Sequence, residues 1–215
     1  MSSEKTPEQK INDILEYIKL GLINLKLQED SVPAIPTVEL KENQTLELAF
    51  ISRARPGSSI LQTTFDDHRK VIEYIAARLG YKVSFWKGFD SSPKSLRYPP
   101  DPDLIRKPGL RWVIVEQKSI DDSELKTTDI LSHTNGIFCG PEGLLPLINS
   151  ISINKSYHIR LAGYCVFHGG IQSQLCLAIN NHNKTIKFYY SKLDKDEQVF
   201  VTPKFWEVSQ KSTIL

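Results

Sequence analysis

The first apolar pattern in the chain has helical spacing and follows a recognisable helix start. In Thr6-Pro7-Glu8-Gln9, Thr is a favoured N-cap, Pro fits the first turn, and Gln can close a capping box. The apolar positions that follow at helical spacing are Ile11, Ile14, Leu15, Ile18, Leu22 and Leu25. They predict a helix that runs to about Lys26. Its apolar stripe packs on its own domain, or it forms an interface with a second copy or a partner helix.

Two short strand patterns come next. Residues 28–36 contain two prolines, which is typical of a linker that ends the helix. Thr37–Leu40 and Leu46–Ile51 then flank a polar stretch, Lys41-Glu42-Asn43-Gln44, and predict a β-hairpin. We therefore expect an N-terminal amphipathic helical arm over residues 1–30 and a single domain over residues 31–215.

A second helical pattern has clear end signals. Thr64 is the expected N-cap, and Gly80 is the expected terminator. The apolar face of this helix comprises Phe65, Ile72, Ile75, Ala76 and Leu79, and Glu73 lies at its edge. Tyr81–Trp86 follows as a strand.

From Tyr157 onward the pattern alternates instead of following helical spacing. Its strand-like segments are Tyr157–Phe167, Gln174–Ile179, Thr185–Tyr190 and Val199–Thr202, and turn sequences separate them. This predicts an antiparallel meander. Helices ahead of a run of hairpins indicate the α+β class, with helices packed on a mixed sheet that ends in the meander.

Composition narrows the class of protein without deciding its function. The 215 residues, 40% hydrophobic and 24% charged, are typical of a globular domain, and the net charge of +2 neither requires nor excludes nucleic acid. The three cysteines have no paired spacing, which favours a reducing compartment. No window is apolar enough for a membrane span, so we expect a cytoplasmic protein without a membrane partner.

The strongest candidate chemistry lies at the end of one apolar run. Leu110–Ser119 predicts a buried strand that ends in Glu116-Gln117-Lys118, and a Pro-rich segment containing Asp101 and Asp103 precedes it. A carboxylate before a strand and another at its end can converge on Mg²⁺, which prefers oxygen ligands. A lysine two residues after the glutamate lies on the same side of the strand.

This order of residues resembles the PD-(D/E)xK nuclease superfamily over about residues 64–167. The resemblance implies a Mg²⁺-dependent nuclease that hydrolyses DNA or RNA. Asp103 and Glu116 would then bind the metal, together with the Gln117 carbonyl, Lys118 would activate water, and Glu73 would be a supporting carboxylate. The alternative is that Glu116 and Lys118 form an ordinary ion pair at a strand end, worth about 0–1 kcal/mol if exposed.

Other hypotheses remain open from the sequence. The segments Leu110–Val115, Gly140–Leu147 and Gln174–Ile179 also resemble a widespread bacterial family of no known activity, in which the carboxylates need not be catalytic. A non-enzymatic protein-interaction module would use the Ile11–Leu25 stripe or the meander surface. A thiol enzyme would use Cys139 with His133, His158 or His168 as its base, but a cysteine beside Phe138 is typical of a small buried hydrophobe.

The last sheet offers a further candidate surface. Its aromatic residues, Phe188, Tyr189 and Tyr190, alternate with or lie near Lys184, Lys187 and Lys192. Such a set can stack on bases and contact phosphates of single-stranded nucleic acid. The same alternation is what any half-buried strand requires.

Overall fold

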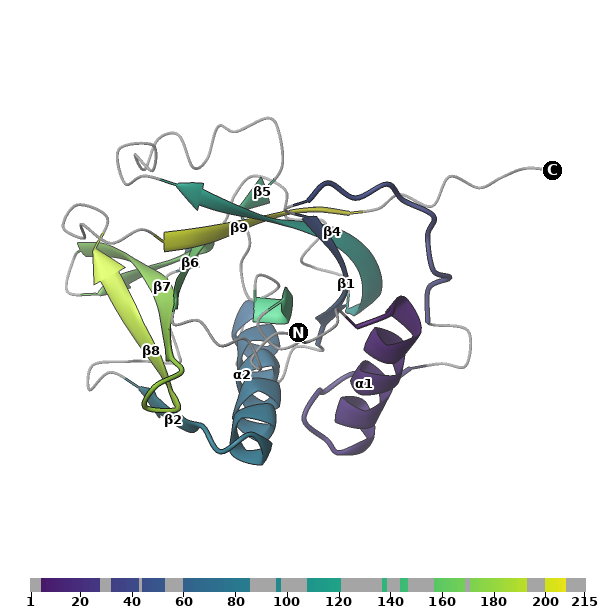
Figure 1. Cartoon of the computed structure of the whole chain (residues 1–215), viewed down its shortest axis with the longest axis horizontal. Helices are drawn as coiled ribbons and strands as arrows, with labels where there is room; N and C mark the ends of the chain where they lie inside the picture. Colours follow the sequence, from purple (N-terminus) through teal and green to yellow (C-terminus); the bar gives the residue numbers. More distant parts are fainter. Residues whose placement is uncertain are drawn as a thin grey trace.

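One mixed β-sheet and two helices make up most of the described chain (Figure 1). The computed structural model describes residues 5–27, 32–42, 44–52, 60–85, 96–97, 108–120, 137–138, 144–146, 157–168, 171–192 and 200–207, some of them by their backbone alone. The elements are α1 (Pro7–Lys19), β1 (Gln44–Ile51), α2 (Ile60–Arg78), β2 (Lys82–Phe85), β3 (Leu96–Arg97), β4 (Gly109–Ile120), β5 (Ile137–Phe138), β6 (Tyr157–His168), β7 (Ile171–Asn180), β8 (Thr185–Lys192) and β9 (Phe200–Glu207). The predicted α+β class is confirmed.

The strand order of the sheet is β1-β4-β9-β6-β7-β8-β2, with β3 added to β6 and β5 added to β9. Most neighbours are antiparallel, but β2 runs parallel to β8, and β9 runs parallel to β6. The meander is confirmed for β6, β7 and β8. The expected fourth meander strand is instead β9, which leaves the meander and pairs with β4.

The sheet curves around α2. His68 of α2 stacks on Phe50 of β1 with ring centroids 3.9 Å apart. Phe65 of the same helix meets Phe188 of β8 edge-on at 6.1 Å. Because β1 and β8 lie near opposite ends of the strand order, one helix reaches both only if the sheet bends around it, as Figure 1 shows. The hydrophobic core lies in this curve.

The start of α1 agrees with its sequence, and its end does not. Thr6 accepts a hydrogen bond from the backbone N–H of Gln9, and the Gln9 side chain accepts one from the N–H of Thr6, so the capping box is confirmed. The helix ends at Lys19, well before the predicted Lys26. Gly21 adopts φ +71°, and the next N–H, that of Leu22, donates to the Tyr17 carbonyl, which is the Schellman pattern.

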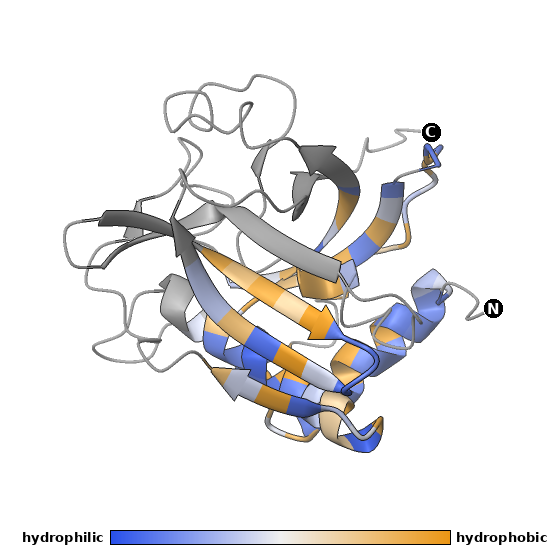
Figure 2. Cartoon of the chain, turned by 60° about the vertical axis from the view of Figure 1, so that its left-hand side comes forward, coloured by the Kyte–Doolittle hydropathy of each residue, from blue (hydrophilic) through white to orange (hydrophobic). Residues whose placement is uncertain are grey.

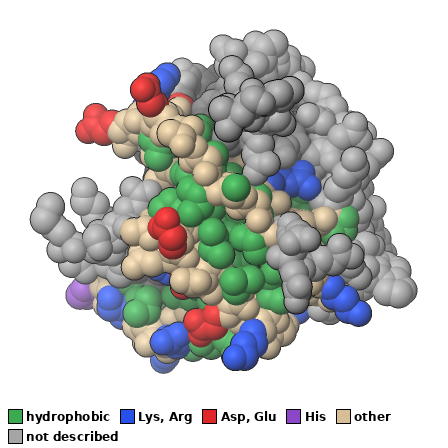
Figure 3. All heavy atoms as spheres, turned by 90° about the vertical axis from the view of Figure 1, so that its right-hand side faces the viewer, with side chains coloured by type: hydrophobic (Ala, Val, Ile, Leu, Met, Phe, Trp, Pro, Cys, Tyr) green, Lys and Arg blue, Asp and Glu red, His purple; other side chains and the backbone are tan. Residues whose placement is uncertain are grey.

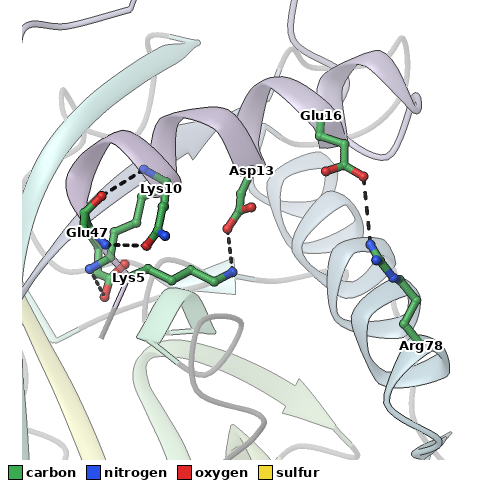
Figure 4. Close-up of polar contacts among 8 residues, drawn as sticks. Lys5, Lys10, Asp13, Glu16, Glu47 and Arg78 are labelled. Carbon is green, nitrogen blue, oxygen red and sulfur yellow. Dashed lines mark hydrogen bonds and ion pairs between the residues drawn. The ribbon is translucent and has the colours of Figure 1, made fainter. Parts of the chain in front are cut away.

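α1 packs against β1 and contributes to the shared core. Of the predicted stripe, Ile14 and Leu25 are buried, and Leu15 is the one exposed member. Lys10 is buried as well, and its Nζ donates to the Leu46 carbonyl at 2.6 Å and to Glu47 Oε1 at 3.2 Å (Figure 4). An ion pair and apolar packing therefore both fix α1 to the sheet.

The contact between α1 and α2 is aromatic and polar. Tyr17 meets Tyr74 edge-on, with ring centroids 6.2 Å apart. The Tyr74 hydroxyl donates to Glu16 and accepts from Arg78. Arg78 lies 4.0 Å from Glu16, and Figure 4 shows this ion pair. Burial raises the pKa of the Tyr17 hydroxyl above its ordinary value. The carboxylates of Asp13 and Glu16 raise this pKa further, as does Tyr74, whereas Arg78 lowers it.

The raised pKa of Tyr17 predicts a loss of stability at high pH. The unfolded chain releases this proton at about pH 10, whereas the folded protein retains it. The free energy of unfolding should therefore fall as the pH rises above about 10, by about 1.4 kcal/mol per pH unit for this group. Urea unfolding of the wild type and Tyr17→Phe between about pH 9 and pH 12 measures it. Identical slopes for the two proteins would contradict the prediction.

The predicted hairpin is wrong, because β1 pairs with a strand far away in the chain. The hairpin of Thr37–Leu40 with Leu46–Ile51 is not formed: residues 33–41 are not a strand, and β1 pairs antiparallel with β4 instead. The preceding segment lies against β4, where the Trp112 indole donates to the Pro33 carbonyl at 3.1 Å.

The second helix also departs from its expected start. α2 begins at Ile60, so Thr64 lies inside the helix and is not its N-cap. Its predicted end is confirmed, because Gly80 adopts φ +75° directly after the last turn. Among the described residues, no helix is long and apolar enough to span a bilayer.

Candidate functional site

The predicted site centres on Glu116 in β4. The apolar residues before it are largely buried, with Trp112, Val113 and Val115 at most 3% exposed. This burial fixes the strand, and Glu116 emerges half-buried at its polar end. β4 does not end there, because it continues to Ile120 in antiparallel pairing with β9.

Glu116 lies where the pairing of β4 with β1 ends. Its partner in the register is Gln44, the first residue of β1. Gln44 Nε2 donates to Glu116 Oε2 at 3.0 Å, and Gln44 Oε1 accepts from the backbone N–H of Lys41 at 3.1 Å. The amide is thus held at both ends, and it orients the carboxylate. Such secondary hydrogen bonds are typical of carboxylates that bind metals, and they also occur in purely structural sites.

The other members of the predicted site are described only in part. Lys118 follows Glu116 by two residues, so its position is on the same face of β4, opposite Thr202 of β9. Gln117 lies between them, opposite Pro203. For Lys118 and Gln117 the structure describes only the backbone. Asp101 and Asp103 lie outside the described residues, so their proximity to Glu116 stays a prediction.

Glu73 lies in a different contact. Its Oε1 is 3.8 Å from Nη1 of Arg69, one turn earlier on α2. The Arg69 guanidinium lies 5.6 Å from the ring centroid of Phe85 in β2 and 3.9 Å from Asp66. The structure therefore pairs Glu73 with Arg69 at the α2–β2 contact, while Glu116 is bonded to Gln44. A supporting role for Glu73 remains a prediction.

The described residues contain no group of three or more His, Cys, Asp or Glu side chains arranged to hold a metal ion. Glu116 supplies a half-buried carboxylate with the hard oxygen atoms that Mg²⁺ prefers. The thiol hypothesis falls largely outside the described part, which contains neither Cys139 nor His133. His158 and His168 belong to β6, where only the backbone is described.

Sequence reasoning did not include Gln44 in the site. It is 72 positions from Glu116 in the chain, and nothing in its local pattern links the two. A glutamine at a strand start next to a polar turn has no distinctive signal. The pairing of β1 with β4 would have been needed to identify it.

Comparison of the chain with protein-family models, with curated proteins and with solved structures found no significant match. The residues of the chain and their geometry therefore carry what can be inferred about its function.

Proposed function

We propose that the protein is a metal-dependent nuclease that hydrolyses phosphodiester bonds of nucleic acid through Asp103, Glu116 and Lys118. The single observation that supports this proposal is the oriented carboxylate of Glu116, which a hydrogen bond from Gln44 holds in place. Glu116 lies two residues before Lys118 in the same strand. Because an amide carries no charge, the hydrogen bond from Gln44 orients the carboxylate without placing a counter-ion beside it.

In this proposal each residue has a separate task. Mg²⁺, when bound, neutralises the charge that develops on the phosphate. Glu116 and Asp103 would hold the cation, and Gln44 would keep the Glu116 carboxylate in position. Lys118 orients the attacking water. The water oxygen would form the new P–O bond while the ester P–O bond breaks, and the proton that the water loses would pass through solvent to the leaving oxygen. Asp103 and Glu116 would hold the same ion only with their carboxylates within about 5 Å of each other.

The test is cleavage of plasmid and single-stranded oligonucleotides with Mg²⁺ or Mn²⁺. Glu116→Gln, Asp103→Asn and Lys118→Met should each lower the rate about 100-fold or more, because each removes interactions worth several kcal/mol in the transition state. Glu39→Gln, a change at an exposed carboxylate, is the matched control and should cleave normally.

Gln44→Ala should raise the Mg²⁺ concentration for half-maximal rate about 10- to 100-fold, an effect that lost stability alone would not give. Absence of cleavage, or cleavage that survives Glu116→Gln, overturns the proposal.

The alternative of a non-enzymatic protein-interaction module has one observation in its favour. Four of the large hydrophobic residues that are exposed, Leu15, Leu20, Ile35 and Leu40, belong to α1, the residue after it, and the segment that follows. Hydrophobic side chains gather on this side of the molecule, the right-hand side of Figure 1, as Figure 3 shows. The predicted Ile11–Leu25 stripe supports the alternative less, since most of it is packed against the core. If this surface binds a second copy, Leu15→Ser with Leu20→Ser should lower the molecular mass of the protein in solution. An unchanged mass would show that the surface binds no second copy.

A further inference from the structure

The small net charge conceals an uneven distribution along the chain. Residues 79–89 and 143–193 hold seven Lys or Arg and no Asp or Glu. The rest of the chain therefore holds 20 basic and 25 acidic residues, so +7 in the two segments is offset by −5 elsewhere. Segregation of this kind is typical of a surface that binds a partner of opposite charge.

The fold brings the two acid-free segments together. β2 comes from the first segment, and β6, β7 and β8 come from the second. They are four consecutive strands of the sheet, because β2 pairs with β8 in parallel. The other strands of the main sheet path, β1, β4 and β9, each contain a glutamate. One half of the sheet is thus free of carboxylates along its strands.

Alternation gives β2 and β8 an apolar face and a polar face. The residues that face α2 are buried or packed on the core, for example Ile186 and Phe188. On the opposite face, Lys82, Ser84 and Lys187 are exposed, whereas Thr185 and Tyr189 are half-buried. Figure 2 shows β8 and β2 side by side with these alternating hydrophilic and hydrophobic positions. We call Lys82, Ser84, Thr185, Lys187 and Tyr189 the basic face.

The register puts these five residues next to one another. Lys82 lies beside Thr185, and Ser84 lies beside Lys187. Tyr189 follows Lys187 by two residues on the same face of β8. The turn that leads into β8 adds Lys184, which is exposed and has its Nζ 4.7 Å from the ring centroid of Tyr81. Cations therefore flank hydroxyl groups and one aromatic ring on a sheet surface.

We propose that the basic face binds single-stranded nucleic acid. Lysines contact the phosphates, Ser84 and Thr185 offer hydrogen bonds, and the Tyr189 ring stacks on a base, as on other sheet platforms that bind unpaired strands. An anionic membrane fits this surface less well, because interfacial binding needs exposed apolar side chains. None of the exposed large hydrophobic residues in the described part lies on β2, β7 or β8. The inference goes beyond the nuclease proposal and holds for a protein that binds without cleaving.

The test is fluorescence anisotropy with a labelled single-stranded oligonucleotide of mixed sequence, in EDTA so that no cleavage occurs. Lys82→Ala with Lys187→Ala should reduce the slope of log K against log salt by about 0.7 for each lysine that contacts a phosphate. Lys19→Ala with Lys26→Ala removes the same charge from exposed positions outside the sheet and is the matched control. Tyr189→Ala should weaken binding about 5- to 150-fold, and Tyr189→Phe should restore it.

Each result decides for or against the basic face. A reduced salt slope only in the Lys82/Lys187 variant, with rescue by Tyr189→Phe, supports it. No binding at low salt, equal loss in the control, or equally tight binding of a duplex or of anionic lipid vesicles overturns it. Binding is measured in EDTA and cleavage with Mg²⁺ or Mn²⁺, so failure of the catalytic proposal and failure of the basic face appear in separate assays.

Discussion

Glu47→Ala should lower the free energy of unfolding by about 3–5 kcal/mol. Glu47 and Lys10 are 3% and 4% exposed in their side chains, and 3.2 Å separates the charged atoms. Without the carboxylate, the Lys10 ammonium stays in the buried contact between α1 and β1 and loses the Glu47 counter-charge. Urea unfolding followed by circular dichroism measures the change.

A matched control separates burial from charge. Lys5 and Asp13 also form an ion pair that involves α1, but their side chains are 33% and 27% exposed. Asp13→Ala should therefore cost only about 0–1 kcal/mol. Replacing both buried partners, by Lys10→Met with Glu47→Leu, should recover most of the loss, because no buried charge remains. If Glu47→Ala costs no more than Asp13→Ala, the buried pair does not fix α1 as described.

Phe188→Ala should cost about 3–5 kcal/mol and weaken the attachment of β2. Phe188 is fully buried, stacks on Phe85 of β2 at 5.2 Å, and meets Phe65 of α2 edge-on. Its removal leaves a cavity where a helix and two strands meet. Urea unfolding gives the change in stability, and faster hydrogen exchange of the β2 amides would show the local effect.

Two further variants define the specificity of this effect. Phe188→Leu retains much of the volume and should cost clearly less than Phe188→Ala. Leu79→Ala, at a position 47% exposed, should stay within about 0.5 kcal/mol of the wild type. A loss in Phe188→Ala no greater than in Leu79→Ala would show that the aromatic contacts do not hold β2.

The parts of the fold that depend on neighbouring residues could be predicted from the sequence. The Thr6 capping box, the end of α2 before Gly80 and the β6-β7-β8 meander all have local signals. The end of α1 also had a local signal in Gly21, but the apolar stripe continues beyond it to Leu25. The spacing of apolar residues indicates which face of a segment is buried, but it does not indicate where the backbone hydrogen bonds of the helix end.

The rest depends on contacts between residues far apart in the chain. Gln44 pairs with Glu116, and Lys82 pairs with Thr185, each across a long separation, and no local pattern encodes such a register. For this reason the strand containing Glu116 could be predicted, whereas the amide that orients its carboxylate could not. Asp103, the second carboxylate of the predicted site, lies outside the described residues.

The position of β9 has a consequence for synthesis of the protein on the ribosome. β9 is the last described strand, yet it lies between β4 and β6, in the middle of the sheet. Until residue 207 has left the exit tunnel, the edges of β4 and β6 that β9 covers have no native neighbour. Unpaired strand edges promote association between nascent chains. A chaperone that shields these edges during translation should therefore raise the yield of folded protein.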